Sequence, residues 1–130
     1  MAAFSGDAAP EVVEHADGAL VSLTLNRPKA LNSLNLNMVR LLKAALARYA
    51  ADDARRLLLL EGAGGKAFCA GGDVRAVCLA AQAPADGSDE PLTDAFFREE
   101  YALNAAIAGC PKPQVSLWDG IVMGGGAGLS

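Results

Sequence analysis

The sequence has 130 residues, with 11 Lys and Arg against 15 Asp and Glu, and so a formal net charge of −4. A chain of this length forms one domain with a hydrophobic core rather than two. Its 52% hydrophobic and 20% charged residues exclude disorder as the main state. The acidic balance argues against general nucleic-acid binding. No apolar run approaches the roughly 20 residues that span a bilayer.

The N-terminal segment carries no pattern of a secretion or import signal. Residues 1–18 contain acidic residues but no Lys or Arg, unlike a signal or transit peptide. Residues 1–10 are small and mostly uncharged, so we expect a flexible arm there, followed by one domain over residues 11–130. The expected location is soluble and intracellular, with peroxisome, mitochondrion and cytoplasm left open.

A β-hairpin is the first element expected after the arm. Strands are predicted over residues 11–15 and 19–25, and Gly18 supplies the flexible backbone that a tight turn needs. Pro28 lies just beyond the second strand and cannot donate to a β-ladder, so the strand ends before it. Alternation along the second strand places three apolar side chains on one face: Val21, Leu23 and Leu25.

An amphipathic helix and a buried strand are expected next. Asn35 can cap a helix that begins near Leu36. The run Leu57–Leu60 shows no alternation and precedes a glycine, which is typical of a strand covered on both faces in a parallel sheet. The apolar stripe predicted for the helix consists of Met38, Leu41, Leu42, Ala45, Leu46 and Tyr49.

The second half of the chain continues the alternation of helices and strands. A helix is expected over residues 73–82, then a Gly- and Pro-containing loop over 84–91. Thr93 can cap a further helix that runs to about Ala108. A strand over 114–118 follows, and Ile121–Met123 leads into a glycine turn. The element order is that of an α/β chain without internal repeats.

The nucleophilic and metal-binding residue types offer few candidate sites. Three cysteines without a CxxC pair predict neither a disulfide framework nor a zinc site, and a reducing compartment is the simplest reading. Cys69 could be a nucleophile, but a small buried core cysteine is more common. His15, the only histidine, is expected at the surface. Adjacent Glu99 and Glu100 point about 100° apart on a helix, so at most one faces a given pocket.

The first glycine-rich segment, residues 62–67, fits a relaxed dinucleotide-binding fingerprint after a strand. That fingerprint requires a helix to begin within the motif, and the residues that follow favour no helix start. Ala67 also stands where a phosphate-binding loop needs Ser or Thr. A plain connecting loop is therefore the better interpretation.

Two further glycine-rich segments together predict a binding site for a substrate oxygen. They are Phe68–Asp73 and Met123–Leu129. Backbone without side chains lets a substrate oxygen approach two N–H donors, one from each segment. Such donors stabilise the oxyanion that forms when a thioester is attacked or enolised. The residues alone leave a second interpretation open, in which both segments are ordinary tight turns.

Four segments, which begin at Leu25, Gly64, Phe96 and Met123, resemble the crotonase (enoyl-CoA hydratase/isomerase) superfamily, and within it the 3-hydroxyisobutyryl-CoA hydrolases. The resemblance covers nearly everything from residue 11 to 130. Two segments indicate the superfamily, and the FFREEY segment with the CAGGD and GGGAGLS variants favours the hydrolase branch. The segments are Leu25–Asn32, Gly64–Asp73, Phe96–Tyr101 and Met123–Ser130.

This resemblance implies a spiral of ββα turns that binds acyl-CoA, with coenzyme A as part of the substrate and no separate cofactor or metal. The backbone N–H groups of Gly72 and Gly125 would form the oxyanion hole, and Glu100 would line the acyl pocket. Because coenzyme A is polyanionic, local positive charge is expected from basic side chains near its site, namely Arg27, Lys29 and Lys66. Other implied contacts are Ala70, Gly71, Gly72 and Asp73 along the pantetheine, and Lys29 with Ala30 near the nucleotide; Asp73 also suits a helix cap.

The sequence departs from the hydratases at one position. They carry a catalytic glutamate where this chain has Gly128, and glycine can neither give nor take a proton. The resemblance places the hydrolase carboxylates downstream of Ser130, which predicts a truncated spiral. Only four residues follow Gly126, about one helical turn, so the helix expected at this half of the oxyanion hole should be missing.

The expected activity is therefore hydrolysis of an acyl-CoA thioester, as for 3-hydroxyisobutyryl-CoA in valine breakdown. The alternatives are an enoyl-CoA hydratase or isomerase, and a fragment that binds CoA without catalysis. The expected partner is the acyl-CoA substrate, not nucleic acid or membrane. A homo-oligomer, or dependence on a missing C-terminal half, is also expected, because apolar surface built for other segments would be exposed.

Overall fold

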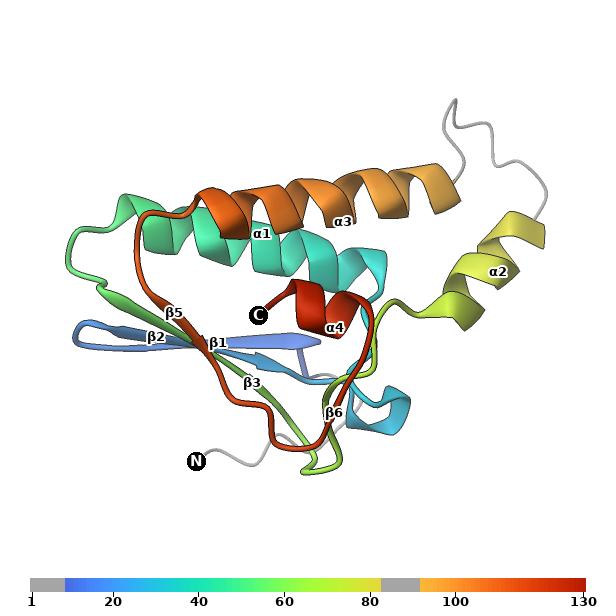
Figure 1. Cartoon of the computed structure of the whole chain (residues 1–130), viewed down its shortest axis with the longest axis horizontal. Helices are drawn as coiled ribbons and strands as arrows, with labels where there is room; N and C mark the ends of the chain where they lie inside the picture. The colour runs from blue at the N-terminus through green and yellow to red at the C-terminus, as the bar shows by residue number, and fades with distance from the viewer. Residues whose placement is uncertain (1–8, 83–91) are drawn as a thin grey trace.

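The computed structural model describes residues 9–82 and 92–130. Four strands form one sheet in the order β1-β2-β3-β5, and two form a second sheet, β4-β6. Figure 1 shows α1 and α3 side by side over one face of the larger sheet, with the short α4 close to the strands. The strands are β1 (Val12–Asp17), β2 (Leu20–Leu25), β3 (Leu57–Gly62), β4 (Ala67–Cys69), β5 (Gln114–Ser116) and β6 (Ile121–Val122). The helices are η1 (Pro28–Ala30), α1 (Leu36–Ala51), α2 (Val74–Gln82), α3 (Leu92–Gly109) and α4 (Gly125–Gly128).

The predicted hairpin and parallel sheet are confirmed. β1 and β2 pair antiparallel, and Gly18 between them has φ +55°, a backbone conformation that glycine adopts without strain. β3 pairs parallel with β2, and β5 pairs parallel with β3. The predicted inner face of β2 is buried, with Val21, Leu23 and Leu25 each no more than 3% exposed. β5 is shorter than the strand expected over 114–118 and ends at Ser116.

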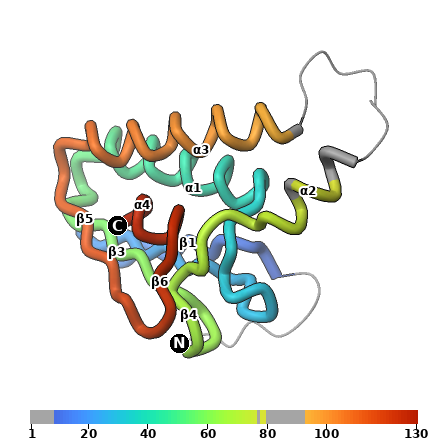
Figure 2. The backbone as a smooth tube through the Cα atoms, turned by 45° about the vertical axis from the view of Figure 1, so that its right-hand side comes forward, coloured from blue at the N-terminus to red at the C-terminus, as the bar shows by residue number. Residues whose placement is uncertain are grey.

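The first strand of the second sheet, β4, was not predicted from the sequence. β4 follows the glycine loop after β3 and pairs parallel with β6 (Figure 2). All three residues of β4 are buried, so the strand shows no alternation that would mark it in the sequence. β4 overlaps the start of the segment Phe68–Asp73, and β6 lies directly before the segment Met123–Leu129, so this pairing brings the two segments together.

Helix α1 begins as expected and packs with one difference. The Asn35 side chain accepts a hydrogen bond of 2.8 Å from the Met38 N–H and so caps the helix. Leu41, expected in the apolar stripe, is 36% exposed, whereas Val39 is fully buried. The buried face of α1 is therefore rotated toward Val39, and α3 packs beside α1.

Three further expectations about the helices are corrected or lie outside the described residues. Thr93 is the second residue of α3 rather than its cap. The helix expected to be missing after Gly126 is present as the single turn α4. The loop expected over 84–91 and the arm expected over 1–10 fall mostly in residues 83–91 and 1–8, outside the described residues.

Asn32 is the buried polar side chain that ties the loops around the site to one another. It is 0% exposed, donates hydrogen bonds of 2.9 Å to the carbonyls of Ala63 and Ala67, and accepts one of 2.9 Å from the Arg27 N–H. These bonds join the η1 segment to the residues on either side of the glycine loop between β3 and β4. In residues 9–82 and 92–130, no helix is long and apolar enough to cross a bilayer.

Candidate active site

The two glycine segments meet next to each other in the fold. A Cβ atom placed on Gly125 would lie 3.6 Å from the Gly72 nitrogen, and one placed on Gly71 would lie 3.6 Å from the Gly125 nitrogen. Neither the Gly72 nor the Gly125 N–H donates a hydrogen bond to any described residue. The two predicted N–H donors are thus side by side and free to bind a ligand oxygen.

The backbone around Gly72 explains why its N–H is free. The Leu34 N–H donates to the Gly71 carbonyl at 2.8 Å, and the Asp73 N–H donates to the Leu34 carbonyl at 2.7 Å. Leu34 is thus bonded to the residues on either side of Gly72. In a parallel pairing of this kind, the residue between the two bonded ones, here Gly72, points its own N–H away from Leu34. Gly71 has φ +104°, which a side chain would strain, so glycine is required for this path.

Glu100 lies directly beside Gly125. It is 8% exposed on α3, and a Cβ atom on Gly125 would lie only 2.6 Å from its Oε1. Position 125 therefore has no room for a side chain while Glu100 holds this conformation. Burial raises the pKa of the Glu100 carboxyl above its usual value.

The two adjacent glutamates have different surroundings, as their helical spacing predicts. Glu99 faces Arg40 on α1, which donates to its carboxylate with Nε at 3.0 Å and Nη2 at 2.9 Å. The Arg40 hydrogen bond, with the charge of Arg40, lowers the pKa of Glu99. Glu100 alone of the pair lines the cavity beside the glycines.

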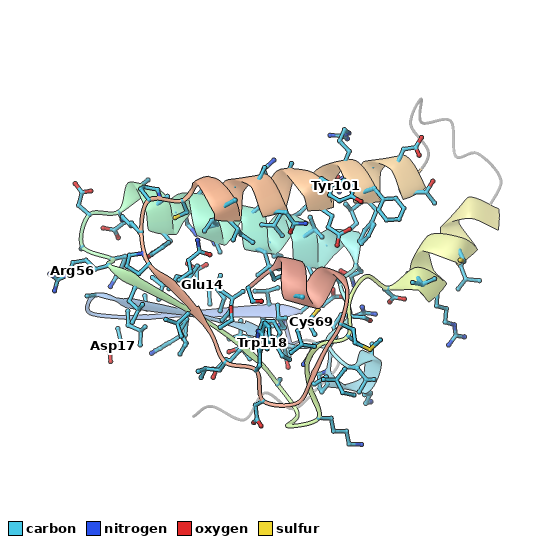
Figure 3. All side chains as sticks on the ribbon, in the orientation of Figure 1. Glu14, Asp17, Arg56, Cys69, Tyr101 and Trp118 are labelled. Carbon is cyan, nitrogen blue, oxygen red and sulfur yellow. The ribbon has the colours of Figure 1, made fainter. Side chains whose placement is uncertain are left out.

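This cavity has a volume of about 420 Å³ and a largely apolar wall. The Phe96 ring lies 3.5 Å from where a Gly72 Cβ would be, and it packs edge-on against Phe97 with ring centres 5.5 Å apart. Phe97 in turn stacks with Tyr101, which Figure 3 shows on α3. An apolar wall with a few polar groups suits a small acyl chain. The lining residues are Gly72, Val74, Phe96, Phe97, Glu100, Tyr101, Asn104, Gly124, Gly125 and Gly128.

Asn104 is a cavity residue that the sequence interpretation missed. It lies one helical turn after Glu100 on α3, and a Cβ atom on Gly128 would lie 3.5 Å from its Nδ2. Its Oδ1 is buried without a hydrogen-bond partner among the described residues. The i, i+4 spacing from Glu100 was the available signal, because residues four apart share a helix face.

Of the residues predicted to contact the rest of coenzyme A, only Gly72 lines the cavity. Lys29 and Ala30 lie on η1, outside the cavity lining, and the Lys29 side chain is exposed. Ala70 donates its N–H to the Leu31 carbonyl at 3.1 Å, which holds the start of the second glycine segment against the end of η1. The two predicted contact groups are thus neighbours, although no ligand contact is assigned to them.

Arg27 and Asp73 have structural partners. Arg27 donates to an Asp73 carboxylate oxygen at 3.0 Å and to the Ser33 carbonyl at 2.7 Å. Asp73 also accepts from the Ala76 N–H at 3.0 Å, and this bond, with that from Arg27, lowers its pKa. Asp73 therefore caps α2, as expected. The positive charge predicted for a ligand at Arg27 is already paired, which leaves Lys29 and Lys66.

The remaining candidates take structural or surface positions. Cys69 is fully buried under α4 (Figure 3), and burial raises the pKa of its thiol, so it has the properties of a core cysteine rather than a nucleophile. His15 is exposed on β1. Within the part of the chain that the structure describes, no group of His, Cys, Asp and Glu could hold a metal ion.

Comparisons with known proteins agree on the kind of protein that the chain resembles. The family model described as enoyl-CoA hydratase/isomerase matches residues 20–130. The chain is 48% identical over 124 residues to the mitochondrial 3-hydroxyisobutyryl-CoA hydrolase of Homo sapiens, covering 95% of this chain and 31% of that protein. It is 55% identical over 108 residues to the Xenopus tropicalis protein of the same name, covering 83% and 27%.

The fold is also that of a solved relative. A crystal structure described as a carnitinyl-CoA dehydratase from Mycobacterium thermoresistibile matches with a TM-score of 0.81 and 47% identity, covering 91% of this chain and 33% of that one. The predicted α/β fold of the crotonase type is confirmed by this match. The chain spans between 27% and 33% of the length of these three relatives.

Proposed function

Because the chain belongs to the enoyl-CoA hydratase/isomerase family, we propose that it carries the carbonyl-binding and acyl-binding part of a 3-hydroxyisobutyryl-CoA hydrolase. The observation that carries the proposal is the pair of free N–H groups at Gly72 and Gly125 beside an apolar cavity. The names of the relatives supply the substrate, since two of them, 48% and 55% identical, are named as hydrolases of that thioester.

The chemistry assigned to these residues is the stabilisation of negative charge on the thioester oxygen. When water attacks the carbonyl carbon and loses a proton, the carbonyl oxygen becomes an oxyanion. The carbonyl then re-forms as the carbon–sulfur bond breaks, so that the free acid is produced and CoA leaves as a thiolate that takes up a proton. Two preorganised N–H donors at Gly72 and Gly125 bind that oxygen as its charge develops. The cavity wall at Phe96 and Glu100 encloses the acyl chain.

A second candidate is hydration or dehydration of an enoyl thioester, favoured by the name of the structural relative. The same two N–H donors would serve that reaction. The family resemblance, however, assigns the glutamate of the hydratases to the position of Gly128, which has no side chain. For this reason we prefer hydrolysis.

The substrate supplies coenzyme A, so the proposal requires no separate cofactor. An intracellular location is supported by the three free cysteines, Cys69, Cys78 and Cys110, which suit a reducing compartment. The two hydrolase relatives are named as mitochondrial proteins, and peroxisome and cytoplasm are the other compartments included in the proposal.

The proposal is tested by calorimetric titration of the 130-residue chain with CoA and with a ketone analogue of 3-hydroxyisobutyryl-CoA. In this analogue a methylene group replaces the thioester sulfur, so it keeps the carbonyl and cannot be hydrolysed. We expect the analogue to bind about tenfold more tightly than CoA, because the carbonyl gains two hydrogen bonds.

Gly125→Ala should abolish most of this preference, because the added Cβ displaces Glu100 and narrows the approach to both N–H groups. Gly109→Ala is the matched control, since a Cβ there meets nothing within 4 Å. Circular dichroism verifies that both variants fold. Equal affinity of the unmodified chain for CoA and the analogue, or binding of neither, would overturn the proposal.

A further inference from the structure

Asn104 presents an unsatisfied hydrogen-bonding group in the wall of the acyl cavity. Its Oδ1 is buried and accepts no hydrogen bond from the described residues. Buried polar atoms are nearly always paired, so each exception calls for an explanation such as a missing ligand. Among the described residues that line the cavity, the other polar side chains are those of Glu100 and Tyr101.

The position of Asn104 relative to the oxyanion donors is set by two helices. On α3 it lies four residues after Glu100, and so on the same face. On the other side it faces Gly128 of α4, with the side-chain atoms Nδ2 and Oδ1 3.5 and 3.6 Å from where a Gly128 Cβ would be. Gly128 is three residues after Gly125, a rise of about 4.5 Å in a helix.

We propose that Asn104 determines specificity by accepting a hydrogen bond from a hydroxyl group on the acyl chain of the thioester. This inference rests on the proposed function, because it requires the carbonyl oxygen to be bound at Gly72 and Gly125. In such a thioester the hydroxyl is on the second carbon after the carbonyl carbon. The separation between the carbonyl group and this hydroxyl is comparable to the rise along α4 from Gly125, at the carbonyl, to Gly128, beside Asn104. Such a hydroxyl is the donor that Oδ1 lacks.

The surroundings favour recognition of a hydroxyl over an apolar acyl chain. The cavity wall around Phe96 is apolar, so water that would otherwise pair with Asn104 is displaced when an acyl chain enters. An acyl chain without a hydroxyl then leaves the amide oxygen unpaired, which costs binding free energy. A site of this kind rejects the analogue that lacks the hydroxyl.

The alternative is that Asn104 serves only to hold α3 against α4. In that case a substitution at position 104 weakens the fold and the binding of every acyl chain to the same extent. A ratio of affinities for two acyl chains separates the two roles, because a structural change cancels in the ratio.

The experiment titrates the 130-residue chain with two non-hydrolysable ketone analogues, those of 3-hydroxyisobutyryl-CoA and of isobutyryl-CoA, which lacks the hydroxyl. We expect the hydroxylated analogue to bind about tenfold more tightly to the unmodified chain. In Asn104→Leu, which has a similar side-chain shape, this ratio should fall to about one. Asn37→Leu is the matched control, because Asn37 is exposed on α1, and it should keep the ratio.

The outcomes distinguish this inference from the proposed function. If the unmodified chain binds both analogues more tightly than CoA but with equal affinity, hydroxyl recognition is overturned and the proposed function stands. If it binds neither, both are overturned. A ratio that survives in Asn104→Leu also overturns the role of Asn104. Asn104→Ala provides the same measurement should the leucine variant fail to fold.

Discussion

At the scale of single residues, the site depends on a carboxyl group and a glycine that occupy adjacent space. Glu100 is buried without a cation to pair with it among the described residues, whereas its neighbour Glu99 is paired with Arg40. A buried unpaired carboxylate is costly, and its pKa rises as a result. A side chain at Gly125 would displace Glu100, because the Glu100 Oε1 lies only 2.6 Å from where its Cβ would be. Stability has thus been given up at the wall of the cavity beside the two glycine segments.

The raised pKa of Glu100 predicts a pH-dependent gain in stability for Glu100→Gln. Because the folded pKa lies above the unfolded value, folding favours the protonated form. The stability that this group contributes is present below the unfolded pKa, about 4.3, and is lost as the pH rises through the folded pKa. Glutamine does not titrate, so Glu100→Gln should raise the melting temperature at pH 7, and the gain should vanish near pH 4.

Glu99→Gln is the matched control for this prediction, since the pKa of Glu99 is lowered by the hydrogen bond from Arg40. Its effect should have the opposite sign: a small loss of stability that is fully present above the unfolded pKa, and so at pH 7, and that disappears only as the pH falls through the lower folded pKa. Thermal melts of both variants between pH 4 and 8 measure these effects. An unchanged or lower melting temperature of Glu100→Gln at pH 7 would contradict the burial argument.

At the scale of elements, the ends of helices and the short loops between strands position the site. Asn35 caps α1, and Asp73 caps α2 directly after Gly72. The Arg27–Asp73 ion pair links that second cap to the turn before η1. The Gly72 donor is therefore held in place by side-chain bonds at the start of α2, whereas α4, which carries Gly125, has no side-chain cap.

Loss of the α1 cap in Asn35→Ala should lower the free energy of unfolding by about 1 kcal/mol, because the Met38 N–H loses its acceptor. Asn35 also donates to a Glu11 carboxylate oxygen at 2.6 Å, a bond that the variant loses as well. Asn37→Ala is the control, since this exposed side chain lies inside the helix and alanine is a better helix former. Urea denaturation measures both, and equal stabilities of the two variants would refute the role of the cap.

At the scale of the whole molecule, the contacts that hold the site join residues that are far apart in the sequence. Asn32 joins the η1 segment to Ala63 and Ala67, and the Tyr49 hydroxyl donates to the Pro113 carbonyl at 2.6 Å, joining α1 to the start of β5. Exposed apolar side chains gather in the chain from β5 to β6. Their association with further protein, as a homo-oligomer or with more of the fold, stays a prediction. They are Val115, Leu117, Trp118 and Ile121.

Asn32→Ala should destabilise the whole fold by about 2–4 kcal/mol, because three hydrogen bonds are lost and two carbonyls, one of them buried, lose a donor. Asn32 also has φ +55°, where alanine is strained by about 1 kcal/mol or more. Asn32→Gly separates the two effects, since glycine removes the same bonds without the strain. Chemical denaturation should rank the unmodified chain first, then Asn32→Gly, then Asn32→Ala. A loss below about 1 kcal/mol in both variants would contradict the assigned role.

The extent of what could be predicted differs between backbone and side chains. The strong alternation of β2 and the uninterrupted apolar run of β3 predicted the hairpin and the parallel pairing, because burial on one or both faces leaves a pattern in the sequence. β4 left no such pattern, since three consecutive buried residues carry no period. Leu41 was assigned to the wrong side of α1 because periodicity does not show where a neighbouring helix covers a face.

For the site, the sequence by itself determined which chemical groups are present. These are two glycine segments whose backbone no side chain covers, a pair of adjacent glutamates, and a glycine rather than a carboxylate at position 128. Only the tertiary structure decided that Glu100 faces the cavity while Glu99 pairs with Arg40, that the charge of Arg27 is already paired with Asp73, and that Asn104 joins the wall. The reason is physical. Local sequence sets which groups share a face or lack a side chain, whereas burial and hydrogen bonding depend on what packs against that face from elsewhere in the chain.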